Sequence, residues 1–134
     1  KPNNLVSQVK SAPTGVDEQA GLLLTNEEGQ MASVMLSLHS KQPKRGMVSC
    51  EKGYIEIMEY PRAWEATITY TDSGKTELIK AGENADALAY ELADMEKAIN
   101  GDVDCMHFDY TKDVMDMMTE FRKSWGFKYP EEEK

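Results

Sequence analysis

The first 80 residues alternate between apolar and polar side chains, which is the pattern of β-strands. The alternation is clearest over residues 30–40, where every second residue from position 32 is apolar: Ala32, Val34, Leu36 and Leu38. Because successive side chains of a strand point to opposite faces of a sheet, the residues between them are predicted to share the other face: Met31, Ser33, Met35, Ser37 and His39. Further strands are predicted over residues 4–10, 16–25, 44–50, 54–60, 64–70 and 75–80.

Short polar segments that contain glycine separate several of these strands. Thr25–Gly29 and Tyr70–Gly74 each carry Asn or Asp early in the turn and Gly at its end, and Glu51–Gly53 is a shorter example. This chemistry suits a type I turn closed by a residue at positive φ. Strands joined by such tight turns run antiparallel. The sequence therefore predicts a mostly antiparallel, meander-type sheet of about six or seven strands.

The last 50 residues change to a helical period. One apolar stripe runs over residues 85–100 and a second ends near Trp125. The two stripes consist of Leu88, Leu92, Met95 and Ile99, and of Val114, Met117, Met118, Phe121 and Trp125. We therefore expect an α+β fold in which two C-terminal helices cover one face of the sheet, with Tyr90, Leu92 and Met95 of the first helix in the core. The opposite sheet face would then be open to a partner.

Length and charge narrow the class of protein. The chain has 134 residues, enough for one core, and we take residues 1–134 as a single domain. The net charge of −9 argues against a nucleic-acid partner and disfavours anionic membrane surfaces. Apolar runs are too short to span a membrane. The chain opens on Lys1 without an initiator Met, so we expect a fragment or a processed chain, and Cys50 and Cys105 are expected to be reduced thiols of a cytoplasmic protein.

The sequence contains no recognisable motif for catalysis, cofactor binding or metal ligation, so no residue is assigned to any of these roles. No two glycines are separated by one residue, so the chain has neither a G-x-G-x-x-G motif nor a Walker A loop. The segment Asp102–His107 has the wrong spacing for an EF-hand and too few ligands for zinc, so it is interpreted as an acidic loop. His39 has the chemistry of a general base, but a single His at a strand end is expected to be a surface or interface residue.

Several segments of the chain are informative through their order and spacing. They are Gly15–Glu18 with Asn26–Ala32, then Glu51–Ile57, then Ala89–Glu91 with Ala98–Gly101, and finally Phe121–Pro130. Together these segments resemble the C-terminal domain of the Gfo/Idh/MocA oxidoreductases, and the similarity extends over essentially the whole chain. The ending, Phe121–Pro130, resembles the branch of the family that contains dihydrodiol and xylose dehydrogenases.

The resemblance implies that part of the enzyme precedes these segments. Members of this family carry an N-terminal Rossmann domain that binds NAD or NADP and a Glu-Lys-Pro motif with the catalytic lysine, and neither has a counterpart here. No catalytic or cofactor-binding residue of the family is therefore carried over, and the chain alone is expected to bind no cofactor and to be inactive. The expected partner is the missing Rossmann domain.

The resemblance also implies a role for this domain. In the family it lines part of the substrate pocket and forms the oligomer interface through its open sheet face. We therefore expect a substrate-binding and oligomerisation domain of an NAD(P)-dependent oxidoreductase that acts on a sugar, polyol or cyclic diol. Met31, Ser33, Met35, Ser37 and His39 would form the homo-oligomer interface, and Met58 and Tyr60 would line the small-molecule site. The alternative is a free-standing, non-enzymatic α+β module that dimerises or binds a small ligand.

Overall fold

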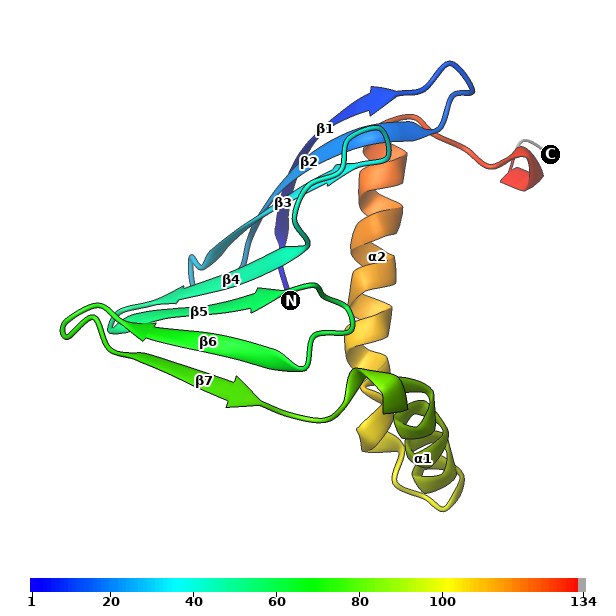
Figure 1. Cartoon of the computed structure of the whole chain (residues 1–134). Helices are drawn as coiled ribbons and strands as arrows, with labels where there is room; N and C mark the ends of the chain where they lie inside the picture. The colour runs from blue at the N-terminus through cyan, green and yellow to red at the C-terminus, as the bar shows by residue number, and fades with distance from the viewer. Residues whose placement is uncertain (133–134) are drawn as a thin grey trace. The chain divides into compact units, whose positions relative to one another are not determined.

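The computed structural model describes residues 1–132 and confirms the α+β class, with seven strands followed by two α-helices (Figure 1). The predicted single sheet is wrong, because the strands form two antiparallel sheets, ordered β1-β2-β3 and β4-β5-β6-β7. The break falls between Ser37, where β3 ends, and Arg45, where β4 begins. A tight turn forces its two strands to pair, whereas a connection of this length does not.

The chain divides into two compact units, each of which is described by itself. The first unit comprises Lys1–Lys41 and His107–Lys134, and the second comprises Gln42–Met106. That residues 1–134 form a single domain stays a prediction. Within residues 1–132, no helix is long and apolar enough to cross a membrane.

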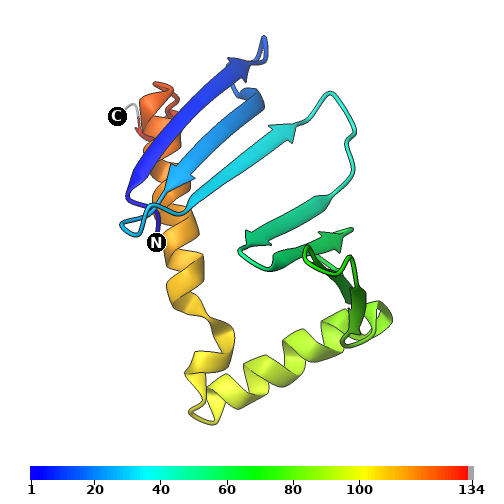
Figure 2. The ribbon, with the colours of Figure 1, turned by 90° about the vertical axis from the view of Figure 1, so that its left-hand side faces the viewer.

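The first unit is a three-stranded sheet with a helix on one face. Its elements are β1 (Asn4–Ser11), β2 (Asp17–Thr25), β3 (Met31–Ser37), α2 (Phe108–Ser124) and the short helix η3 (Pro130–Glu132). Figures 1 and 2 show α2 along one side of this sheet. Phe121 and Ala20 are buried, and the Trp125 indole N–H donates to Ser7 Oγ at 2.8 Å. The core of this unit therefore lies between α2 and the β1–β2 pair.

Strand register confirms the predicted division of β3 into two faces. Val34 pairs with Leu22, which pairs with Ser7, the residue that Trp125 contacts. Directly opposed residues of antiparallel strands share a face, so Ala32, Val34 and Leu36 lie on the helix side. Met31, Ser33, Met35 and Ser37 lie on the other side, which we call the outer face.

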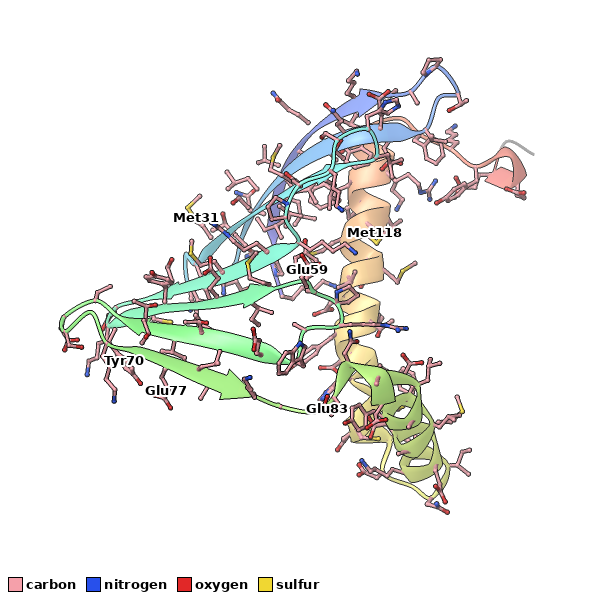
Figure 3. All side chains as sticks on the ribbon, in the orientation of Figure 1. Met31, Glu59, Tyr70, Glu77, Glu83 and Met118 are labelled. Carbon is pink, nitrogen blue, oxygen red and sulfur yellow. The ribbon has the colours of Figure 1, made fainter. Side chains whose placement is uncertain are left out.

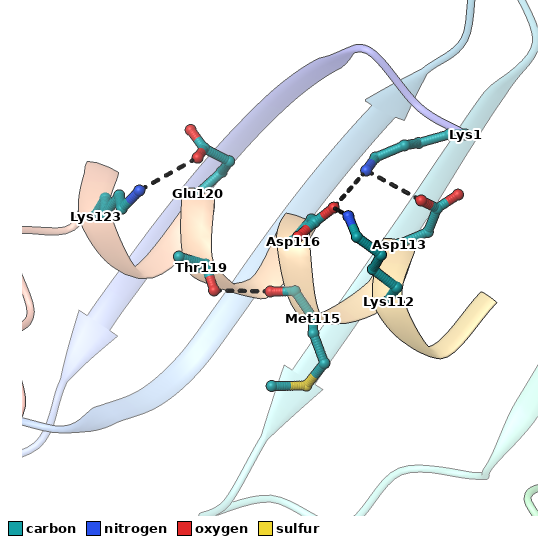
Figure 4. A network of polar contacts seen from close by, with 8 residues as sticks. All are labelled: Lys1, Lys112, Asp113, Met115, Asp116, Thr119, Glu120 and Lys123. Carbon is teal, nitrogen blue, oxygen red and sulfur yellow. Dashed lines mark hydrogen bonds and ion pairs between the residues drawn. The ribbon is translucent and has the colours of Figure 1, made fainter. Parts of the chain in front are cut away.

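A charged network fastens the start of the chain to α2 (Figure 4). The Lys1 ammonium lies 3.0 Å from Asp113 and 2.8 Å from Asp116, and Lys112 binds Asp116 at 2.9 Å. The hydrogen bonds from Lys1 and Lys112 lower the pKa of Asp116 to about 2. This network holds the residues before β1 against the helix that covers the sheet.

The second unit is a four-stranded meander followed by α1. Its elements are β4 (Arg45–Cys50), β5 (Gly53–Met58), β6 (Glu65–Tyr70), β7 (Thr76–Lys80), η1 (Asn84–Asp86), α1 (Ala87–Ile99) and η2 (Val103–Met106). One face of this sheet, the aliphatic face, collects apolar side chains that register places together: Val48, Ile55, Ile57, Ala66, Ile68 and Ile79. Of these, Val48 is 59% exposed and Ile79 is 43% exposed.

The prediction that both helices cover one sheet face is wrong. The helices belong to different units, and α1 packs chiefly against η1 and η2, its neighbours in sequence. Its apolar stripe of Leu88, Leu92, Met95 and Ile99 is exposed, with Leu92 at 70%, so Leu92 and Met95 are not core residues. Tyr90, also expected in the core, is 47% exposed. Periodicity identifies the apolar side of a helix but does not say what covers it.

Candidate functional site

The outer face of β1–β2–β3 collects four of the five predicted interface residues. Met31 and Met35 are each 66% exposed, and Figure 3 shows Met31 on the side of the sheet away from α2. Register adds Val6 and Leu23, which oppose each other and lie next to Ser33. Methionine and aliphatic side chains in one exposed row are typical of the centre of a protein interface, whereas a solvated face is rich in Lys and Glu.

Met35 shapes the middle of this face. It is directly opposite Gly21 on β2, and a Cβ added at Gly21 would lie 3.2 Å from the Met35 sulfur. The absence of a side chain at Gly21 therefore leaves room for the thioether next to it. Val6, Leu23 and Met35 contribute to the lining of a shallow hollow of about 470 Å³ here. The result is an apolar depression at the centre of the outer face.

The fifth predicted residue, His39, lies in a charged cluster beyond the end of β3. Its Nε2 is 3.7 Å from Glu18 Oε2, and the Lys10 ammonium donates to Glu18 Oε1. The pairing of β1 with β2 shifts between Lys10 and Ser11, so Glu18 has no directly opposed residue on β1. Such a β-bulge re-aims a side chain, and here it brings the Glu18 carboxylate close to Lys10 and His39.

The environment of Glu18 favours its ionised form. Glu18 is 7% exposed, and a buried carboxylate is costly unless it is paired. The hydrogen bond from Lys10 lowers the pKa of Glu18, and the charges of His39 and Lys10 act in the same direction against the effect of burial. The cluster therefore anchors the end of β3 electrostatically, and it orients the His39 imidazole, which is 71% exposed.

Replacing Glu18 with glutamine is expected to flatten the acid dependence of stability. A carboxylate whose pKa is lower in the fold contributes stability above its ordinary pKa of 4.5 and loses that contribution as the pH falls through the lower value. The variant should be less stable at neutral pH and should lose less stability below pH 4.5. Urea unfolding between neutral pH and about pH 3 measures this difference. Parallel profiles for the two proteins would contradict it.

Met58 and Tyr60, the predicted substrate-lining residues, belong to the second unit. Met58 ends β5 opposite Arg45, and Tyr60 follows in the β5–β6 connection. They are 42% and 44% exposed. Their part in substrate binding stays a prediction.

Sequence reasoning missed Glu18 and Lys10 as neighbours of His39. A bulge breaks the alternation by one residue, and the alternation alone places these side chains on different faces. One feature of the sequence could have indicated this cluster: two adjacent carboxylates, Asp17 and Glu18, stand at the start of a strand whose centre is apolar. A carboxylate in such a position needs a cation nearby.

Neither a metal-binding group in the described residues nor a match to a known protein indicates the function. Within residues 1–132, no group of three or more His, Cys, Asp or Glu side chains is arranged to hold a metal ion. The sequence matches no protein-family model, and no curated protein matches it. Function is therefore inferred from the residues and their arrangement.

Proposed function

We propose that this chain is the substrate-binding and oligomerisation domain of an NAD(P)-dependent oxidoreductase that acts on a sugar, polyol or cyclic diol. The observation that carries the proposal is the amount of apolar surface exposed on regular elements. The exposed elements are the outer face, the aliphatic face and the α1 stripe. The resemblance of segments such as Gly15–Glu18 and Phe121–Pro130 to the Gfo/Idh/MocA family supplies the enzyme class.

The total accessible surface supports a domain that is completed by other surfaces. The chain exposes 10954 Å² for a mass of 15.1 kDa. A compact monomer of that mass would expose about 7,100 Å², and two separate compact units of half the mass about 8,500 Å² together. The excess is present even by the second standard, which treats each unit by itself. Surface of this kind is usually covered by a partner.

The outer face suits a second copy of the chain. Three strands of eight, nine and seven residues cover roughly 14 by 26 Å, so two flat faces of that outline in contact would bury about 700 Å² in total. A specific interface buries about 1,000 Å² or more, so the pairing would include residues around the edges of the face. A two-fold axis would place the Met35 depression of one copy against that of the other.

The α1 stripe and the aliphatic face suit the preceding domain of the enzyme. The four large side chains of the stripe, from Leu88 to Ile99, line one side of a helix about 20 Å long. A surface helix with this pattern buries its apolar side against other structure. The proposed occupant is the Rossmann domain that precedes the corresponding segments in the family.

The residues of this chain do not fit a dinucleotide. A dinucleotide pyrophosphate binds where a glycine-rich turn leads from a strand into a helix N-terminus. In the described structure the connection from β7 to α1 carries Glu83 and Asp86, whose negative charges oppose phosphate. The cofactor is therefore assigned to the missing domain, and no step of hydride transfer is assigned to residues of this chain.

The isolated chain is expected to show no dehydrogenase activity and no measurable affinity for NAD(H) or NADP(H). Calorimetric titration with each cofactor tests this, and micromolar binding would contradict the proposal. The matched experiment joins the chain to the region encoded upstream of Lys1. An upstream region with G-x-G-x-x-G and Glu-Lys-Pro motifs should restore binding and activity. A reading frame that begins near Lys1 would instead favour the free-standing module.

A further inference from the structure

Methionine supplies half of the large apolar side chains on the outer face. Strand register places four such side chains there: Val6, Leu23, Met31 and Met35. Val6 and Leu23 oppose each other in the row between the two methionines. The remaining residues that register adds to this face are polar, apart from one glycine: Asn4, Gln8, Lys10, Gln19, Gly21, Thr25, Ser33 and Ser37. The apolar centre of the face therefore depends on two thioethers.

Both methionines are open to a small oxidant. Met31 and Met35 are the two most exposed of the nine methionines in the chain. Because Gly21 has no side chain, the Met35 thioether is not covered by a side chain from the position directly opposite it on β2. Met35 also helps to line the depression of about 470 Å³, which is large enough to admit a peroxide molecule.

A peroxide oxidises a thioether by transferring one oxygen atom to the sulfur. A sulfur lone pair attacks one oxygen of hydrogen peroxide, an S–O bond forms and the O–O bond breaks. The proton on the transferred oxygen passes to the departing hydroxide, which leaves as water. Sulfur is oxidised, peroxide is reduced, and the product is methionine sulfoxide. A flexible apolar side chain has then become a polar one that accepts hydrogen bonds.

The new oxygen atoms have different environments in a single copy and in a pair. On a single copy they are hydrated, because both side chains are exposed, so the fold is unaffected. Between two paired outer faces they are removed from water among apolar side chains, and a polar group buried without a hydrogen bond is costly. A two-fold axis doubles this cost, because each copy contributes both methionines.

We propose that Met31 and Met35 form a modification site, at which oxidation by a peroxide separates self-associated copies of the chain. This proposal rests on the self-association proposed above and adds the chemistry that controls it. Association protects the site in turn, because paired faces exclude the oxidant. The modification is reversible, since methionine sulfoxide reductases convert each sulfoxide back to the thioether.

Sedimentation equilibrium of the full chain, before and after treatment with dilute hydrogen peroxide, tests the site. The dissociation constant should rise at least about tenfold after treatment, and reductases for both sulfoxide epimers should restore it. The double variant Met31→Leu with Met35→Leu keeps an apolar face of similar volume. It should associate equally well with and without peroxide. Because this variant retains Cys50 and Cys105, its insensitivity would exclude thiol oxidation as the cause of dissociation.

A matched pair of substitutions on α2 distinguishes the site from general oxidative damage. Met115 and Met118 are also exposed, and Figure 3 labels Met118 on this helix. The double variant Met115→Leu with Met118→Leu should remain as sensitive to peroxide as the wild type, because both residues lie outside the outer face. Circular dichroism of each oxidised protein separates lost association from lost folding.

Peptide mass spectrometry measures the protection of the site. Sulfoxide at Met31 and Met35 should form more slowly at concentrations where the chain is associated than in dilute solution, whereas the rate at Met118 should be the same in both. A wild type that associates equally before and after peroxide, or a Met31→Leu/Met35→Leu variant that dissociates as readily as the wild type, would overturn the modification site alone. A wild type that is monomeric before peroxide would overturn the self-association and the modification site together.

Discussion

Replacing Met35 with glutamate is expected to dissociate self-assembled copies of the chain and to leave each copy folded. Met35 lies at the centre of the outer face, 66% exposed, so a charged residue there is hydrated in the monomer. In the assembly the same carboxylate would be buried without a partner, at a cost of several kcal/mol. The dissociation constant should therefore rise at least about a hundredfold.

Sedimentation equilibrium of the wild type and of Met35→Glu measures this effect. Met115→Glu is the matched control, because Met115 is 57% exposed on α2 and lies outside the outer face. The control should assemble like the wild type. A wild-type chain that stays monomeric at high micromolar concentration would contradict the assignment of the outer face as an interface of the isolated domain.

Truncating Phe121 to alanine is expected to unfold the first unit at moderate temperature. Phe121 is the large apolar residue buried in this unit, at 5% exposure, and its ring stacks on Trp125 with centroids 6.1 Å apart. Removing a buried phenylalanine side chain costs about 3–5 kcal/mol. Small domains have a total stability of about 5–15 kcal/mol, so the loss takes a large part of it.

Urea unfolding followed by circular dichroism tests this prediction. Met118→Ala is the control on the same helix, because Met118 is 58% exposed, and it should cost less than about 1 kcal/mol. Similar midpoints for the two variants would show that α2 does not supply the core of the first unit. Trp125 emission gives a local readout, since its indole N–H bonds to Ser7.

Alternation along β3 predicted its two faces correctly because strand geometry has a period of two that tertiary packing cannot change. The division of the strands into two sheets could not be predicted in this way. Periodicity describes single strands, whereas pairing across residues 38–44 depends on a connection that does not enforce it. The same limit applies to α1, whose stripe was recognised from its spacing while its lack of cover was not.

The sequence likewise predicts only part of the candidate site. Alternation places Met31, Ser33, Met35 and Ser37 on one face, and the structure keeps them together. The same alternation, extended past the end of β3, groups His39 with them, but His39 lies there beside Glu18. Trp64 and Tyr90 lie 26 positions apart in sequence and line one hollow of the second unit, and only the folded chain brings them together.

The first unit is built from both ends of the chain, and this has a consequence for the order in which the protein folds. The hydrogen bond from Trp125 to Ser7 joins residues separated by 118 positions, whereas every strand pair of the second unit joins neighbours in sequence. Closing the longer loop costs more entropy, and local pairings form earlier. During synthesis the meander can form while α2 is still inside the ribosome, and the first unit closes last. A substitution that slows the meander would therefore delay the docking of α2 without touching any of its contacts.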